Sequence, residues 1–543
     1  MNRGTALRVV FAAVLLVAPL APVLALTTPA PETRHVGDSP GTGAQFDRLF
    51  GDGARPTPVD REVLVTVKLH GEESLSTESL ELRQKRYIQD GSPHVEGYVA
   101  LSDVRDLSSN PAVEVVRMRQ RHRGPSGQVA AGVARVGADS VHDRGLTGDD
   151  VTVGIIDGGF RVSDPELAGH VAAHRSFGAA GDADHGTAVA SVVADTAPDA
   201  DIHVAAVGDT TTAAEYREAV TWLRASGVDV IVDAGSYFGH TDAGTGSLSS
   251  VARNASGDVL FVTSAGNYAQ RHWAGNHVPD GGRWVAFAPG AEGNALADGE
   301  VFAGRVRASL QWTPVDGNGT TADYELYLFR RGIGGPRVVA SASPDGNDSA
   351  VYLDTTVPRG RYYLAVEADD VPGPHRLELF ATRDLAHRTP AGSLAVPASS
   401  RGVLAVGAYD YGTDSIAEFS SRGPVDNRTG VDLVAPDAVA APGTGAAGGT
   451  SFAAPYVAGT AALVLDAHPN ATAAQLRDVL ERSARDVGAP GRDDATGAGL
   501  LDARTAATLA DSRFVLATGA NRTTTATPVP EGTAEPTPAP TPS

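Results

Sequence analysis

The sequence lacks cysteine and contains almost no lysine. Among its 543 residues there are 44 basic ones, and all of these are arginines except Lys68 and Lys85. Without cysteine the chain can form neither disulfides nor thiolate metal sites. The formal net charge is -21, which argues against a basic surface for nucleic acid. These absences exclude cysteine chemistry and disfavour a nucleic-acid partner.

Long apolar runs are also scarce. The run over residues 9–26 follows two arginines, ends in small residues and is interrupted by Pro19 and Pro22. The prolines argue against a stable membrane-spanning helix, so the segment is predicted to be a secretory signal peptide, with an uncleaved anchor as the alternative. No other segment is apolar enough to cross a bilayer. We therefore expect a secreted, extracellular protein.

The charge balance also bears on the environment. An acidic, lysine-poor surface resembles that of proteins from salt-loving microbes, because carboxylates stay hydrated while salt screens their repulsion. A halophilic source is therefore expected. An ordinary acidic protein from a high-GC genome is the alternative.

A serine stands at the start of a predicted helix of small residues. The stretch 448–459 places Ser451 after two glycines and a threonine, among residues too small to cover it. A reactive hydroxyl needs an exposed, rigid mount with backbone N–H groups nearby, and a helix N-terminus supplies both. Ser451 is therefore a candidate nucleophile, with a plain helix-capping serine as the alternative.

Three further polar residues follow apolar segments or begin a helix. Asp157 ends the apolar run 151–156, the pattern of a buried parallel strand whose carboxyl end opens onto a site. His185 lies in the first turn of a predicted helix, and Asn267 follows the apolar run 259–265. They are candidates for an orienting acid, a general base and an oxyanion-binding amide. Taken singly, each could be a cap, a core histidine or a turn residue.

The order Asp157, His185, Asn267, Ser451 resembles that of the subtilase superfamily of serine proteases. The resemblance covers roughly residues 133–509 apart from one insertion, and implies a three-layer α/β fold with a mainly parallel central sheet. It implies peptide-bond hydrolysis through an acyl-enzyme on Ser451, with His185 as general base, Asp157 orienting it and Asn267 binding the oxyanion. A catalytically silent binding protein on the same scaffold, acting through the insertion, is the alternative.

One segment departs from the family pattern. Residues 228–239 occupy the place of the family's substrate-binding strand but do not match its usual Ser-x-Gly register. Gly235, Ser236 and Tyr237 are the residues of this segment expected to contact substrate. The side-chain preference stays open.

Calcium is the cofactor most often tied to this family. The acidic turn 316–318 with Asp323, and Asp182 with Asp184, are interpreted as solvated turns and not as ligand loops. The sequence thus assigns no metal ligand, and a structural calcium ion is only an implication of the resemblance.

Two further segments have patterns of their own. Residues 60–119 alternate predicted strands with predicted helices, one of them over 78–88, and resemble the inhibitor-like α+β prodomain of secreted subtilases. An unrelated accessory domain is the alternative. Residues 282–389 alternate apolar and polar positions between turn residues, which is typical of an antiparallel β-sandwich. This insertion is expected either to modulate access to the substrate cleft or to act as a spacer.

The predicted organisation is a signal peptide (1–26), a propeptide (27–125), a first catalytic part (126–281), the inserted β-sandwich (282–389), a second catalytic part (390–512) and a Thr/Pro-rich disordered tail (513–543). The expected partners are protein or peptide substrates, and the chain's own propeptide as an intramolecular inhibitor. A monomer is expected, with no nucleic acid and no stable membrane span; the tail leaves cell-surface association open.

Overall fold

The computed structural model describes residues 62–69, 80–89, 92–100, 107, 112–118, 128–167, 169–237, 247–315, 322–332, 335–345, 348–369, 371–425, 428–441 and 445–520. The predicted signal peptide and the turn 316–318 lie outside these ranges, as does the chain beyond Ala520. The protein divides into two compact units, residues 1–119 and 120–543.

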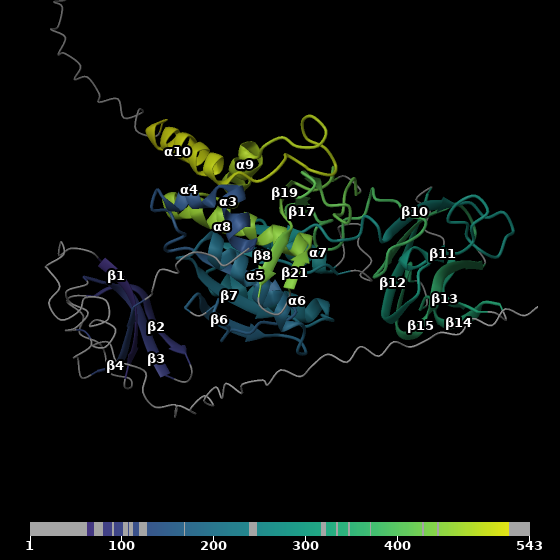
Figure 1. Ribbon diagram of the computed structural model, residues 1–543, viewed down its shortest axis with the longest axis horizontal. Coiled ribbons are helices and arrows are strands. Elements are labelled where there is room, and N and C mark those ends of the chain that lie inside the picture. Colours follow the sequence, from purple (N-terminus) through teal and green to yellow (C-terminus); the bar gives the residue numbers. More distant parts are fainter. Residues whose placement is uncertain are drawn as a thin grey trace, which may run out of the picture. The chain divides into compact units, whose positions relative to one another are not determined.

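The first unit contains a four-stranded antiparallel sheet in the order β2-β3-β1-β4 (Figure 1). Its strands are β1 (Glu62–Leu69), β2 (Leu80–Gln89), β3 (Ser92–Ala100) and β4 (Val113–Met118). The helix predicted over 78–88 is wrong, because β2 occupies this segment. β2 pairs with β3 from Leu80 to Gln89, so cross-strand pairing overrides a composition that is compatible with a helix.

The second unit is built on an eight-stranded sheet in the order β18-β17-β9-β8-β5-β7-β6, with β19 also paired to β17. All of these pairings are parallel except that of β17 with β18. The strands are β5 (Thr152–Asp157), β6 (Val171–Ser176), β7 (Asp201–Ala206), β8 (Val230–Asp233), β9 (Leu260–Ser264), β17 (Leu404–Asp410), β18 (Ser415–Ile416) and β19 (Leu433–Pro436). The central strands β5, β8 and β9 are buried almost throughout, which explains their apolar sequences.

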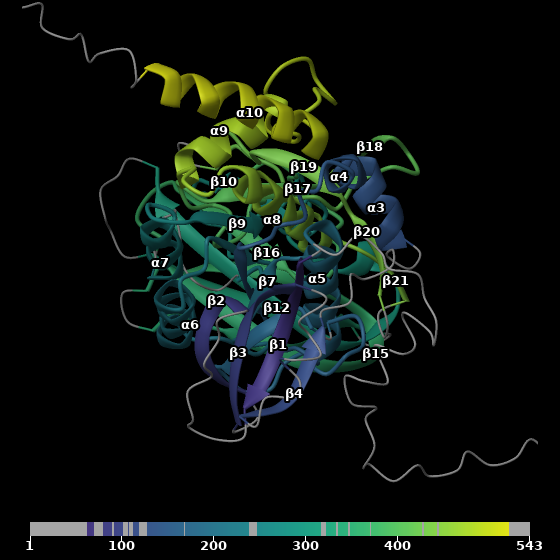
Figure 2. The same cartoon turned by 90° about the vertical axis from the view of Figure 1, so that its left-hand side faces the viewer.

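Helices cover both faces of this sheet. α5 (Ala183–Thr196) and α8 (Thr450–Ala467) share one hydrophobic core with the sheet, whereas α6 (Ala213–Ala225) and α7 (Ser247–Ala255) share another. Figure 2 shows α6 and α7 on one side of the strands and α5 on the other. The predicted three-layer α/β fold is confirmed.

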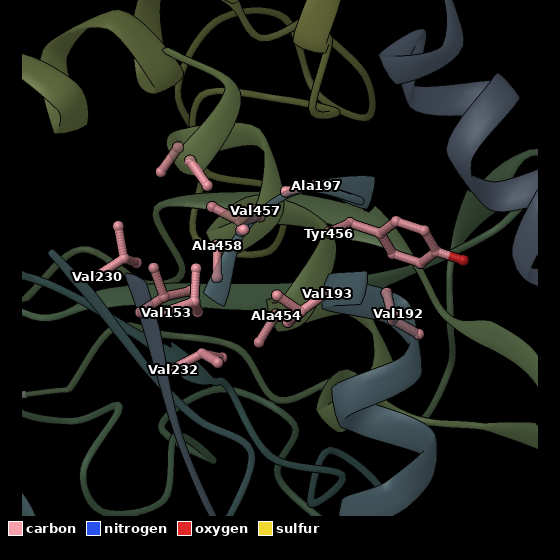
Figure 3. Packing of buried hydrophobic residues seen from close by; sticks show 14 of the residues in the cluster. Val153, Val192, Val193, Ala197, Val230, Val232, Ala454, Tyr456, Val457 and Ala458 are labelled. Atoms are coloured by element: carbon pink, nitrogen blue, oxygen red, sulfur yellow. The ribbon is translucent and has the colours of Figure 1, made fainter. Parts of the chain in front are cut away.

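Small side chains bring α8 close to the sheet and to α5. Figure 3 shows valines of β5 and β8 beside Ala454, Val457 and Ala458 of α8. A Cβ added at Gly459 would lie 2.6 Å from the Cβ of Thr196 in α5. The two helices are therefore packed as closely as a glycine allows.

The described part of the second unit also contains the helices α3 (Gln128–Val136), α4 (Ala138–His142), α9 (Ala473–Ser483) and α10 (Ala503–Ala520). α9 begins with a capping box between Thr472 and Gln475. α10 continues to Ala520, so the first residues of the segment 513–543, predicted as a disordered tail, are helical.

The insertion forms an antiparallel sheet in the order β10-β16-β12-β15-β13-β14, with β11 paired to β15 (Figure 1). Its elements are β10 (His272–His277), β11 (Asn294–Ala295), a 3-10 turn (Ala297–Gly299), β12 (Phe302–Pro314), β13 (Asp323–Arg331), β14 (Arg337–Ala342), β15 (Ala350–Asp369) and β16 (His375–Ala381).

The long strand β15 joins the two halves of this sheet. It pairs with β12 through residues 350–360 and with β13 through residues 361–369. Alternate residues of both halves, such as Leu310, Leu326 and Leu364, share one core. The predicted antiparallel β-domain is confirmed. Its first strand, β10, lies before the expected boundary at 282. The prediction missed this short strand because its sequence lacks a clear alternation of apolar and polar residues.

Candidate active site

Two of the four candidate residues lie at or after the ends of strands of the parallel sheet, and the other two lie in the first turns of helices that cover it. Asp157 is the last residue of β5, and Asn267 follows β9. His185 lies in the first turn of α5, and Ser451 is the second residue of α8. Since parallel strands present their carboxyl ends at one edge of a sheet, segments far apart in sequence meet there.

Asp157 and His185 are hydrogen-bonded. The Nδ1 atom of His185 lies 2.9 Å from each carboxylate oxygen of Asp157. The Asp157 side chain is buried, and the Gly158 N–H donates to its Oδ1 at 2.7 Å. A carboxylate at Nδ1 favours the tautomer with its proton on Nδ1, which leaves Nε2 free to accept another.

The surroundings of His185 favour its charged form. Burial alone lowers the pKa of an imidazole, but the charge and the hydrogen bond of Asp157 outweigh it, with further contributions from Asp182 and Asp209. The pKa of His185 is therefore raised above its ordinary value. The site stabilises an imidazolium, the form that a general base takes after accepting a proton.

The Asp182 side chain fixes the backbone at the start of α5. Its carboxylate accepts from the N–H groups of Asp184 and His185 at 2.9 and 3.3 Å. The Asp182 N–H in turn donates to Asp209 at 2.9 Å. This N-cap places the imidazole next to Asp157.

The Ser451 hydroxyl donates to the carbonyl oxygen of Ala234 at 2.9 Å. The next residue, Phe452, has its ring centroid 5.4 Å from that of His185, so the start of α8 lies against the imidazole. To give its proton to Nε2 of His185, the Ser451 hydroxyl must release the Ala234 carbonyl.

The side-chain amide of Asn267 is held in one orientation. Its Oδ1 accepts from the N–H and the hydroxyl of Thr450 at 3.0 and 3.1 Å. These donors identify the oxygen, so the amide nitrogen is on the other side. A Cβ at Gly449 would lie 3.3 Å from this nitrogen. The NH₂ group therefore faces the backbone just before Ser451, where a donor could hold a developing oxyanion.

The segment expected to contact substrate continues from β8. Gly235, Ser236 and Tyr237 are half-buried. The Tyr237 N–H donates to the carbonyl oxygen of Val396 at 2.8 Å, and Ser264 Oγ donates to that of Gly235 at 3.1 Å. These bonds fix the path of the segment beside the serine.

Sequence reasoning missed Asp233, the last residue of β8. It is fully buried and accepts a 2.6 Å bond from the Tyr216 hydroxyl. A signal was present, because an apolar run ends in this aspartate just as another ends in Asp157.

The acidic turn at the start of α5 does not fit a calcium ion. Asp182 caps the helix, and Asp184 is paired with Arg161. In the part of the chain that the structure describes, no group of three or more histidines and acidic residues is arranged to hold a metal. We therefore assign no calcium ligands and derive no step through a metal.

The model of the Subtilase family, Peptidase S8, matches residues 148–369 and 370–499, well over half of the chain. The chain belongs to the subtilase family. Over 122 residues it is 38% identical to the halolysin-like extracellular serine protease Nep of Natrialba magadii, covering 22% of this chain and 21% of the relative. Over 404 residues it is 26% identical to an extracellular serine protease of Serratia marcescens, covering 69% of this chain and 33% of the relative. The chain therefore spans a third or less of the length of these two relatives.

Two further likenesses extend over most of this subtilase. It is 23% identical to subtilisin E of Bacillus subtilis over 404 residues, covering 71% of this chain and 74% of the relative. The solved structure of the Clostridium perfringens CspB protease has a TM-score of 0.53 at 16% identity, covering 70% of this chain and 99% of that one. This structural likeness bears on the fold alone.

No helix in the described ranges combines the length and the apolar character that crossing a bilayer requires.

Proposed function

We propose that this subtilase is a serine endopeptidase that hydrolyses peptide bonds of proteins through an acyl-enzyme on Ser451. The observation that carries the proposal is the bond between Asp157 and His185, 2.9 Å from Nδ1 to each carboxylate oxygen, beside the helix start that bears the serine. Family membership adds support.

In the proposed mechanism, the Ser451 hydroxyl leaves Ala234 and donates to Nε2 of His185 as it attacks the scissile carbonyl. Asp157 stays ionised and stabilises the imidazolium. The amide of Asn267 and the Ser451 N–H stabilise the oxyanion. The imidazolium then protonates the leaving amine, and a water molecule activated by His185 releases the acyl group.

Labelling with a fluorophosphonate probe tests the nucleophile. The mature protein should be labelled, whereas Ser451→Ala should not react and should lose activity by more than about 10⁴-fold. Ser420→Ala, at a buried serine whose hydroxyl accepts from the Ala408 N–H of β17, is the matched control. An unlabelled, inactive wild-type protein would favour the alternative of a silent scaffold that binds through the inserted β-domain.

We further propose that residues 1–26 direct secretion and that residues 27–125 form a propeptide that inhibits the catalytic domain until it is cleaved. The relatives from Natrialba magadii and Serratia marcescens are named as extracellular proteases, which is consistent with secretion. The S451A protein should then accumulate outside the cell with the propeptide still attached. Its release in mature form would rule out self-processing.

A further inference from the structure

A buried carboxylate lies directly behind the backbone that contacts the nucleophile. Asp233 is the last residue of β8 and is 0% exposed. Ala234, the next residue, bears the carbonyl oxygen that accepts the Ser451 hydroxyl. An ionisable group so deeply buried is costly unless its oxygens are satisfied, so its partners are informative.

Both oxygens of Asp233 accept hydrogen bonds. The Tyr216 hydroxyl of α6 donates to Oδ2 at 2.6 Å, and the Gly235 N–H donates to Oδ1 at 2.8 Å. The Tyr237 hydroxyl approaches Oδ1 at a longer 3.4 Å. The two tyrosine rings meet edge to face, with centroids 5.4 Å apart. The carboxyl group thus connects α6 to the segment expected to contact substrate.

The bond from Gly235 acts on a single peptide plane. The Gly235 N–H and the Ala234 carbonyl belong to the same rigid peptide unit, so a donor held at one end fixes the acceptor at the other. That carbonyl accepts from Ser451 at 2.9 Å and from Ser264 at 3.2 Å. Through this unit, Asp233 controls the acceptor that competes with His185 for the serine proton.

Gly235 is required by the same arrangement. A Cβ at this position would lie 2.6 Å from the Tyr237 hydroxyl and 3.0 Å from Oδ1 of Asp233. Tyr237 therefore folds back over Gly235, where the absence of a side chain leaves room for the phenol. This segment does not have the family's usual Ser-x-Gly register.

We propose that Asp233 is a positioning residue that, together with Tyr216 and Tyr237, sets the orientation of the Ala234–Gly235 peptide. This peptide places the Ser451 hydroxyl and the substrate-facing backbone of Gly235 and the residues after it. The inference rests on the proposed endopeptidase activity. The alternative is that the Asp233 carboxyl group only caps β8 and stabilises the fold.

Kinetics of the mature enzyme on a peptide substrate, with the fluorophosphonate labelling rate, test this role. In Asp233→Ala the peptide loses its acceptor, so we expect KM to rise, kcat and the labelling rate to fall, and kcat/KM to drop about 100-fold. Asp233→Asn keeps an acceptor for the Gly235 N–H and can donate to Tyr216. It should restore kcat/KM to within a few-fold of wild type.

Hydroxyl deletions provide a second test in case Asp233→Ala does not fold. Tyr216→Phe removes the shorter bond and should lower kcat/KM more than Tyr237→Phe, which removes the longer one. Matched controls are Asp229→Asn, whose carboxylate accepts from Thr152 at the opposite end of β8, and Tyr409→Phe, whose hydroxyl donates to Asp414. Both controls should leave kcat and KM unchanged.

The outcomes separate this inference from the function on which it rests. Wild-type kinetics in a folded D233A protein, or in both Phe variants, would overturn the positioning role while leaving the endopeptidase intact. So would a D233N protein as impaired as D233A. A wild-type protein that neither cleaves peptides nor reacts with the probe would overturn both.

Discussion

Two neighbouring strands of the parallel sheet end in a buried carboxylate, yet the two carboxylates have different surroundings. Asp157 at the end of β5 is bonded to the partly exposed imidazole of His185, whereas Asp233 at the end of β8 is enclosed by tyrosines and backbone. β5 and β8 are paired to each other, so sheet position does not explain the difference. The difference comes from the helix next to each strand end, because α5 supplies the His185 imidazole and α6 supplies the Tyr216 phenol.

The same isosteric change at both strand ends tests this contrast most strongly. Asp157→Asn removes the charge that orients His185 and stabilises its imidazolium, so we expect kcat to fall by about 10⁴-fold. Asp233→Asn should stay within a few-fold of wild type, for the reasons given above. Steady-state kinetics on one peptide substrate measures both. Equal losses would mean that the two carboxylates have the same role.

The pH profile of the D157N variant provides the control. In the wild type, kcat/KM should decline as the pH falls through the raised pKa of His185, because the protonated imidazole cannot accept the serine proton. Burial lowers that pKa, and Asp157 is the largest of the opposing causes. The acid limb of the D157N profile should therefore lie at lower pH than that of the wild type. An unmoved limb would contradict this assignment.

The next strand end, after β9, extends the comparison to an uncharged group. Asn267→Ala removes the amide proposed to hold the oxyanion, and kcat should fall by about 10²- to 10³-fold with little change in KM. Thr450→Val, which removes one of the two donors to Oδ1 of Asn267, should cost less. A rise in KM with unchanged kcat would place Asn267 in ground-state binding instead.

A smaller effect is expected on the stability of the fold, which should depend on the protonation of Asp233. Burial raises the pKa of Asp233 from 3.8 to about 7, with its hydrogen bonds opposing the shift. Between these values the folded protein binds a proton that the unfolded chain has released, so stability falls as the pH rises from about 4 to about 7. For a fully buried group the loss is on the order of a few kcal/mol.

Asp233→Asn removes this titration and should therefore gain stability relative to the wild type as the pH rises. Urea unfolding at about pH 5 and pH 8 measures the difference. Both proteins should carry S451A to prevent self-digestion. Other acids with raised pKa values, such as Asp195, are present in both proteins, so their contributions to the difference in stability cancel. Parallel stability profiles would show that Asp233 does not titrate in this range.

Salt should weaken the repulsion between exposed carboxylates and should leave the interactions of the buried Asp157 and Asp233 unchanged. At 0.1 M salt the screening length is about 10 Å, and at 1 M it is about 3 Å, so repulsion within a chain of net charge -21 weakens. We expect activity to rise several-fold from low to molar salt, with the same ratio between wild type and D233N throughout. Equal activity at low and molar salt would contradict the halophilic interpretation.

The fold and the location of the candidate site could be predicted because their signals are local. Apolar runs that end in Asp157 or lead to Asn267, and small-residue helix starts at His185 and Ser451, follow from burial and backbone geometry. The roles of these four residues stay predictions until the variants are measured.

The features that sequence reasoning did not predict depend on contacts between elements or between side chains, and not on the residue pattern within one element. β2 has a composition compatible with a helix and becomes a strand only through pairing with β3. The role of Asp233 depends on Tyr216, which α6 brings across the face of the sheet. Likewise, only the packed structure shows that Tyr237 folds back over Gly235. The apolar and polar pattern within a single element does not encode these contacts.

The close packing at Gly459 links the two helices that bear the proposed base and nucleophile. His185 rides on α5 and Ser451 on α8, and the helices touch where a Cβ of residue 459 would meet Thr196 at 2.6 Å. This contact lies about two turns along α8 from the serine. The distance between the imidazole and the hydroxyl therefore depends on how closely α5 and α8 pack. A methyl group added at Gly459 would meet the last residue of α5, push the two helices apart and change that distance.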